Sequence, residues 1–139
     1  MEKTTLNYEL SKELYDKGDY TANYCYDNVF QNSGVVGNKY PEMKVMFCYL
    51  SVGSIVGLYT RHACFYFNWE AVDPTILDSY KKSGKTLKRI EYIPFKIMSM
   101  NEYFQLIAEE KNTGLYRVLS RIEMDEIRKL NEQGLTVLG

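Results

Sequence analysis

The chain has 139 residues, of which 45% are hydrophobic and 25% are charged, and its formal net charge is −1. This length and composition fit one domain, residues 1–139, with enough core to fold without a disulfide or a metal. The near-neutral charge argues against nucleic acid or an anionic membrane surface as partner, and no apolar run approaches the roughly 20 residues of a membrane helix. The first residues lack the apolar centre of a signal peptide, so we expect a cytoplasmic location.

The three cysteines are expected to be free thiols. Their number is odd, no pair has C-x-x-C spacing, and His62 is the only histidine that could complete a zinc site. Cys48 and Cys64 lie inside apolar runs and are predicted to be core residues. We therefore expect no metal ion and no organic cofactor, and only Cys25 follows a polar segment.

The N-terminal part reads as two helices. Leucines every four residues over 6–14 predict an amphipathic helix that ends at Gly18. A polar turn over 19–23 leads into a second helix that begins near Cys25. Residues 32–38 have the polar and glycine-rich composition of a loop.

The middle of the chain reads as strands. Residues 43–52 and 58–69 are apolar, aromatic or β-branched, which predicts two buried strands. A helical turn is expected over 76–80. Residues 90–97 predict a further strand, and Pro94 places it at a sheet edge or a bulge.

Two capping boxes predict the C-terminal helices. Ser99 with Glu102 starts a helix that runs to about Lys111, and Ser120 with Glu123 starts another. The second helix is expected to turn three apolar side chains inward: Ile122, Ile127 and Leu130. Helices flanking a small antiparallel sheet give an α+β fold class.

Cys25 is the candidate nucleophile, because the free backbone N–H groups at the start of a helix favour a thiolate. His62 begins an aromatic strand, and Asp73 follows a stretch that contains Asn68. If Asn68 lies in a hairpin turn, two adjacent strands carry His62 and Asp73 side by side. The carboxylate can then accept a hydrogen bond from one imidazole nitrogen while the other nitrogen faces Cys25.

Each of these residues also has a non-catalytic interpretation. Cys25 can be a small buried hydrophobic residue, and His62 can be a hydrogen-bonded core residue. Asp73 precedes Pro74, which is a common entry to a helix, so its carboxylate can serve as an N-cap.

Three local sequences resemble those around the triad of transglutaminase-like domains: Tyr24-Cys25-Tyr26-Asp27-Asn28, His62-Ala63-Cys64-Phe65 and Val72-Asp73-Pro74-Thr75. The resemblance covers about residues 20–76. It implies a papain-like or transglutaminase-like core, with N-terminal helices packed on a small antiparallel sheet and C-terminal helices following. It also implies cysteine-dependent acyl transfer on an amide of a peptide or protein substrate, as a peptidase, amidase, deamidase or transglutaminase-like enzyme.

The chain departs from papain-like enzymes six positions before the nucleophile, where Asp19 stands in place of the glutamine that serves as oxyanion donor. An oxyanion hole would then combine the Cys25 backbone N–H with a side chain. The candidates for this role or for substrate binding are Tyr20, Asn23, Tyr24, Asn28 and Tyr40. The alternative is a catalytically silent protein- or ligand-binding module on the same fold, which the 13 tyrosines would also suit.

Overall fold

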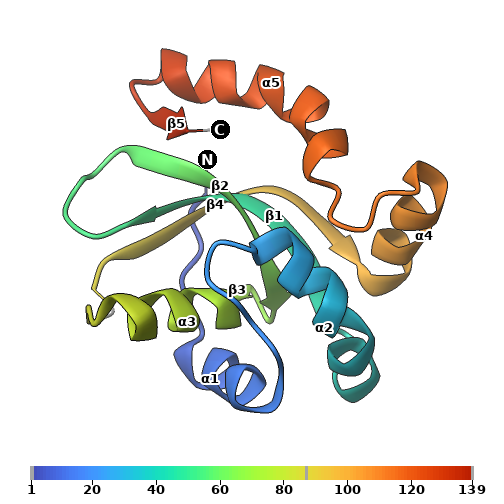
Figure 1. The fold of residues 1–139 in the computed structure, drawn as a ribbon. Coiled ribbons are helices and arrows are strands. Elements are labelled where there is room, and N and C mark those ends of the chain that lie inside the picture. The colour runs from blue at the N-terminus through green and yellow to red at the C-terminus, as the bar shows by residue number, and fades with distance from the viewer. Residues whose placement is uncertain (1, 87, 139) are drawn as a thin grey trace.

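The computed structural model describes residues 2–86 and 88–138 as helices arranged around one sheet (Figure 1). The helices are α1 (Tyr8–Lys17), α2 (Cys25–Lys39), α3 (Pro74–Ser83), α4 (Met100–Glu110) and α5 (Tyr116–Glu132). The strands are β1 (Lys44–Val52), β2 (Leu58–Phe67), β3 (Glu70–Val72), β4 (Ile90–Ser99) and β5 (Thr136–Leu138). The α+β class predicted from the sequence is confirmed.

The sheet runs in the order β3-β2-β1-β4, with antiparallel neighbours, and β5 pairs in parallel with the start of β2. β5 covers residues 58–60 of β2, and β3 covers residues 65–67. In the described part of the chain, residues 61–64 therefore have no strand partner on that edge. This short open stretch is where the candidate site lies.

The two faces of the sheet are covered by different helices. One face buries Phe47 and Phe65 against α2, α4 and α5, and the other buries Met46 and Cys64 against α3. Figure 1 shows α5 above the sheet and α1 and α3 below it. Cys48 and Cys64 are buried, as predicted.

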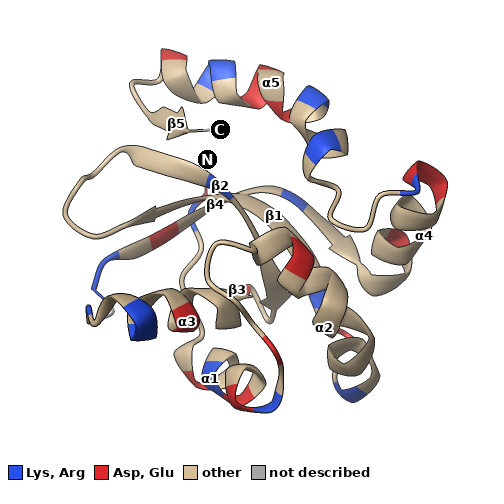
Figure 2. Ribbon diagram, in the orientation of Figure 1, with Lys and Arg blue, Asp and Glu red and all other residues tan. Residues whose placement is uncertain are grey.

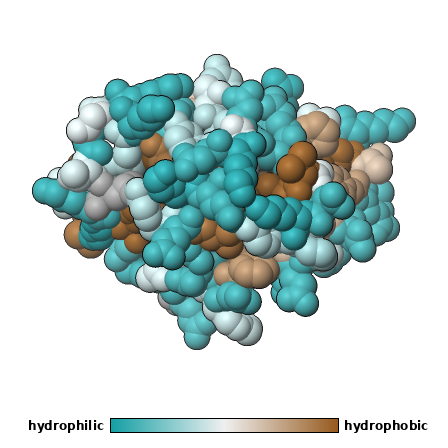
Figure 3. All heavy atoms as spheres, turned by 90° about the horizontal axis from the view of Figure 1, so that it is seen from below, coloured by the Kyte–Doolittle hydropathy of each residue, from teal (hydrophilic) through white to brown (hydrophobic). Residues whose placement is uncertain are grey.

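Acidic and basic residues are interspersed along α1 and α5 in Figure 2. The underside in Figure 3 is mainly hydrophilic, with separate small apolar patches. None of the helices in residues 2–86 and 88–138 combines the length and apolar character that crossing a bilayer needs.

The predicted loop over residues 32–38 is wrong, because α2 continues as a helix to Lys39. Two of its polar residues, Asn32 and Ser33, are buried and hydrogen-bonded rather than solvated. Asn32 donates to the Asn28 carbonyl at 2.8 Å, and the Ser33 hydroxyl donates to the Phe30 carbonyl at 2.8 Å. The polar composition predicted a loop, whereas these side-chain hydrogen bonds allow the polar residues to lie within a helix.

The expectations for β4 and α4 are confirmed. Pro94 lies in an edge strand, and the ladder with β1 shifts register next to it, between Phe47 and Cys48. α4 begins with the predicted capping box: Ser99 Oγ accepts from the Glu102 N–H at 3.1 Å, and the Glu102 carboxylate accepts from the Ser99 N–H at 3.0 Å.

The second predicted capping box is wrong. Ser120 lies inside α5, and the buried Glu123 forms an ion pair with Arg61 of β2. Leu130 is buried as predicted, but Ile122 is 52% exposed. Ile127 is partly buried beside Leu130, so the prediction is wrong for Ile122 alone. The inward face of α5 also includes the charged Glu123, which the apolar pattern does not indicate.

Arg61 joins α5 to β2 through several contacts. Its guanidinium donates to Ser120 Oγ and to the Tyr116 carbonyl, both at 2.8 Å, and lies 3.9 Å from the centre of the Tyr116 ring. The side chains of Arg61 and Glu123 are only 5% and 0% exposed. Burial raises the pKa of Glu123 above its ordinary value, and the neighbouring guanidinium opposes that rise.

The Arg61→Ala substitution should lower the free energy of unfolding by about 3–5 kcal/mol near neutral pH, because it leaves Glu123 buried and unpaired. The loss should shrink as pH falls, since a carboxyl whose pKa is raised in the folded state destabilises that state only while it is ionised. Urea unfolding at several pH values measures both effects.

Arg128 provides the matched control. It forms an ion pair with Asp125 on the same helix, but both side chains are well exposed. Arg128→Ala should change the free energy of unfolding by less than about 0.5 kcal/mol. Equal losses in the two variants would contradict a structural role for the buried pair.

Candidate functional site

The β2–β3 hairpin brings His62 and Asp73 together. Asn68 and Trp69 form its turn with φ of 50° and 68°, the left-handed conformation that suits a tight hairpin. Asp73 directly follows β3, and its Oδ2 lies 2.7 Å from His62 Nε2. The hairpin that the sequence predicted near Asn68 is therefore present, and it sets this contact.

The Asp73 carboxylate contacts the imidazole rather than capping α3. Asp73 occupies the N-cap position and Pro74 the first helical position, but the side chain makes no capping hydrogen bond. Its Oδ2 accepts from His62 and from the Tyr92 hydroxyl, which is also 2.7 Å away. The residue is 0% exposed, so its charge is held by buried partners.

Two residues around Asp73 were not identified from the sequence. Tyr92 reaches the carboxylate from β4, and the Ser11 hydroxyl of α1 accepts from the Asp73 backbone N–H at 2.8 Å. Nothing near either residue in the sequence indicates this role, because it depends on the order of strands and the packing of α1.

Cys25 is the first residue of α2 and is half-buried. The first backbone hydrogen bond of this helix is donated by the Asn28 N–H to the Tyr24 carbonyl, at 2.8 Å. The backbone N–H of Cys25 is therefore not used by the helix. This end of the helix faces the open stretch of β2.

The Cys25 thiol and the His62 imidazole influence each other's ionisation. Burial alone would raise the pKa of Cys25, but the charge of His62 and hydrogen bonds from the imidazole and the Ala63 backbone outweigh it, so the pKa is lowered. Burial opposes protonation of His62, yet the charges of Asp73 and Cys25 raise its pKa well above the ordinary value. These directions favour a thiolate–imidazolium pair.

A pocket of about 430 Å³ gives access to Cys25. Asn23 and Tyr24 line one side, and the α4–α5 connection with Gly114 lines another. A Cβ at Gly114 would come within 3.2 Å of Asp27 Oδ1. Glycine therefore lets this connection approach the first turn of α2.

The structure places the other sequence-predicted residues in two groups. Asn23 and Tyr24 line the Cys25 pocket, whereas Tyr20 and Asn28 are buried and do not line it. Tyr40 follows the far end of α2, and its hydroxyl donates to Glu13. The site thus brings together Asn23 and Tyr24 with the three triad candidates but does not include Tyr20, Tyr40 or Asn28.

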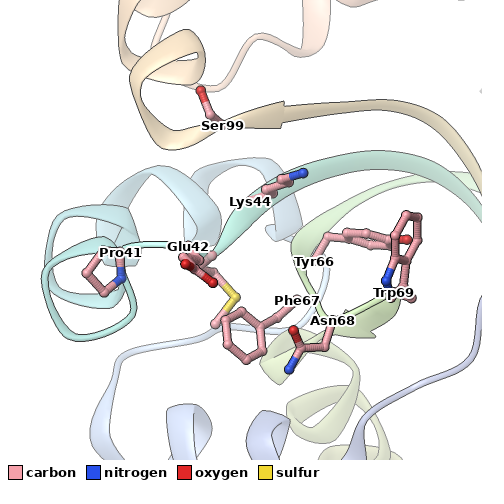
Figure 4. A pocket seen from close by; sticks show the side chains of 9 residues that line it. Pro41, Glu42, Lys44, Tyr66, Phe67, Asn68, Trp69 and Ser99 are labelled. Carbon is pink, nitrogen blue, oxygen red and sulfur yellow. The ribbon is translucent and has the colours of Figure 1, made fainter.

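A second hollow of about 400 Å³ lies beside the β2–β3 turn (Figure 4). Tyr66, Phe67 and Trp69 line it together with Glu42 and Lys44, and none of its lining side chains is a cysteine or a histidine. In residues 2–86 and 88–138, no group of three His, Cys, Asp or Glu side chains is arranged to hold a metal ion. The pocket lined by Cys25 is the candidate active site because it contains the candidate nucleophile.

No protein-family model, no curated protein and no solved structure matches this chain. A functional assignment therefore depends on the geometry of the site itself.

Tyr92→Phe should lower the free energy of unfolding by about 1.5–3 kcal/mol, because it removes a hydrogen bond to a buried charged group while keeping the ring. Urea unfolding measures the loss. Tyr24→Phe alters an exposed tyrosine and should change stability by less than about 0.5 kcal/mol. No difference between the two variants would mean that Tyr92 does not hold the carboxylate.

Cys25 should react with iodoacetamide faster than an ordinary thiol of pKa about 8.5 when the pH lies below that value. In His62→Ala this advantage should disappear, because burial alone then raises the pKa of the thiol. Alkylation rates against pH, with peptide mapping, measure this residue separately from the buried Cys48 and Cys64. A slow reaction that is indifferent to His62 would refute the ion pair.

Proposed function

We propose that the protein is a cysteine-dependent enzyme of acyl transfer on amides, with Cys25 as nucleophile, His62 as base and Asp73 as the group that orients the base. The observation that carries the proposal is the chain of contacts from the pocket inward. The thiol faces the pocket, its pKa is lowered by His62, and His62 Nε2 is bonded to the buried Asp73. This is the arrangement that nucleophilic catalysis by a thiol requires.

In the proposed reaction the Cys25 thiolate attacks the carbonyl carbon of the amide, and the carbonyl electrons move onto oxygen. The tetrahedral species collapses as the C–N bond breaks, and the His62 imidazolium gives its proton to the leaving amine. The product is a thioester on Cys25. Water or a second amine then attacks the thioester, His62 takes the proton of the attacking group, and the thiolate leaves.

Asp73 sets the tautomer in this mechanism. Because Nε2 donates to the carboxylate, Nδ1 is the imidazole nitrogen that exchanges protons with the sulfur and the leaving amine. Tyr92 and Ser11 hold Asp73 in position from two other elements. The base is thus restrained from the side opposite the pocket.

The order of elements supports a papain-like or transglutaminase-like core. The nucleophile begins a helix that packs on the sheet, the base lies in β2, and its orienting carboxylate directly follows the adjacent antiparallel strand β3. The pocket is bordered by tyrosine rings, amide side chains and charges of both signs. Such a surface suits a peptide or protein segment that presents an amide.

A binding module on the same fold is the second candidate, and the hollow in Figure 4 favours it. Trp69 is the chain's one tryptophan, and it is 85% exposed at a positive φ. That backbone conformation is unfavourable for a bulky residue, and the exposed ring buries little apolar area that would stabilise the fold in return. An aromatic side chain displayed in this way suits recognition of a partner.

Mass spectrometry of a peptide mixture incubated with the protein should separate these candidates. The enzyme should produce cleaved peptides, deamidated peptides or, with an added primary amine, amine-linked peptides, and Cys25→Ala should abolish the change. Each product identifies a different acceptor for the thioester. If wild type and Cys25→Ala leave the mixture equally unchanged while peptides are retained by both, the binding module is the better description.

A further inference from the structure

The loop that precedes Cys25 is held in place by side chains of α2 and α3. Asn32 accepts from the Asp19 N–H at 3.2 Å and donates to the Asp19 carbonyl at 2.9 Å. Asn28 makes the same pair of bonds to Thr21, at 3.1 Å and 2.7 Å. The loop geometry therefore depends on two buried amide side chains of the nucleophile's own helix.

A third anchor comes from α3. The Asp78 carboxylate accepts from the Ala22 N–H at 2.7 Å and from the Tyr15 hydroxyl at 2.7 Å. The Asn28 amide also donates to Thr75 Oγ1 at 3.0 Å. Because α3 begins directly after Asp73, the helix that anchors the loop also fixes the position of Asp73.

These hydrogen bonds engage most of the backbone N–H groups of residues 19–24. The N–H groups of Asp19, Thr21 and Ala22 donate to side chains, and that of Tyr24 donates to the Thr21 carbonyl at 3.2 Å. The side-chain amides of Asn28 and Asn32 are engaged, whereas in the part of the chain that the structure describes the side-chain amide of Asn23 has no hydrogen-bond partner. It is exposed and lines the pocket two positions before Cys25.

We propose that the Asn23 side-chain amide is the second oxyanion donor of the Cys25 site, acting with the Cys25 backbone N–H. The inference rests on the proposed function and gives it a further catalytic residue. As the thiolate attacks, the carbonyl oxygen gains negative charge, and two N–H donors held in advance stabilise it. The anchored loop keeps the Asn23 backbone fixed, so only its side chain turns to meet the oxygen.

The other oxyanion candidates from the sequence lie elsewhere. Tyr20 is buried outside the pocket, Tyr40 donates to Glu13 beyond the far end of α2, and Asn28 is engaged in holding Thr21. Tyr24 lines the pocket with an exposed side chain and is the remaining competitor. A test must therefore compare Asn23 with Tyr24.

Asn23→Gly is the variant of choice. Asn23 has φ of 72°, which glycine adopts without strain, so the substitution removes the amide and leaves the loop free to keep its conformation. Asn68→Gly is the matched control, because Asn68 also has a positive φ, of 50°, and lies in the β2–β3 turn. Tyr24→Phe tests the competing donor.

Two reagents separate the oxyanion step from thiolate formation. Iodoacetamide alkylates the thiolate at a saturated carbon, and no oxyanion forms. p-Nitrophenyl acetate acylates the same sulfur through a tetrahedral oxyanion and releases p-nitrophenolate. Asn23→Gly should leave the alkylation rate of Cys25 within about twofold of wild type and slow its acylation about 10²-fold, as loss of one oxyanion donor does. Asn68→Gly should change neither rate, and Tyr24→Phe should be acylated faster than Asn23→Gly.

The outcomes distinguish this inference from the proposed function. If His62-dependent alkylation is intact and Asn23→Gly acylates at the wild-type rate, Asn23 is not the donor, while the proposed nucleophile stands. A selective loss of acylation in Tyr24→Phe would transfer the role to Tyr24 and overturn the inference. Equal losses of alkylation and acylation in Asn23→Gly would also overturn it, because Asn23 would then act on the thiolate.

Discussion

The buried carboxylate of Asp73 is the group on which the arrangement of the other elements depends. An ionised carboxylate that is fully removed from water must be hydrogen-bonded and paired. The partners of its Oδ2 come from different strands: His62 from β2 and Tyr92 from β4. Pairing one charge therefore fixes the relative positions of two strands that are separated by β1, and the Asp73 backbone N–H, which donates to the Ser11 hydroxyl, adds α1 to the same residue.

The same constraint connects folding with the proposed chemistry. Because Asp73 holds Nε2 of His62, the other nitrogen is directed toward the first turn of α2, where the thiol of Cys25 lies. The loop before Cys25 is anchored to α3, which starts at Pro74. The residues proposed as nucleophile, base and orienting group are thus positioned by polar bonds that meet at α3 and at Asp73, the residue before it.

Sequence reasoning succeeded where the signal is local. The start of α2 at Cys25, the turn at Asn68 and the capping box at Ser99 each depend on a few adjacent residues, and the structure has all three. Tyr92 could not be found in this way, since its contact with Asp73 requires the strand order β2-β1-β4. The capping box expected at Ser120 was wrong for a related reason.

That expectation treated Glu123 as a local partner, whereas its partner is Arg61 on a distant strand. Likewise, residues 32–38 were predicted to form a loop from their polar composition, whereas the Asn32 amide bonds to a preceding segment that only the folded chain brings near. Tyr20 and Tyr40 both lie outside the Cys25 pocket, because α2 separates them: Tyr20 precedes the helix and Tyr40 follows its far end. Proximity along the chain is a poor guide to proximity in a site once a helix intervenes.

The gap in the sheet edge at residues 61–64 of β2 limits how the chain could change its length. The gap exists because β3 stops short of it on one side and β5 on the other. Extending β3 beyond Val72 by two further pairs would place a new strand partner opposite Ala63, whose backbone contacts the Cys25 sulfur. Since the two flanking segments are far apart in sequence, an insertion at either one could separate thiol from imidazole without touching any residue of the site.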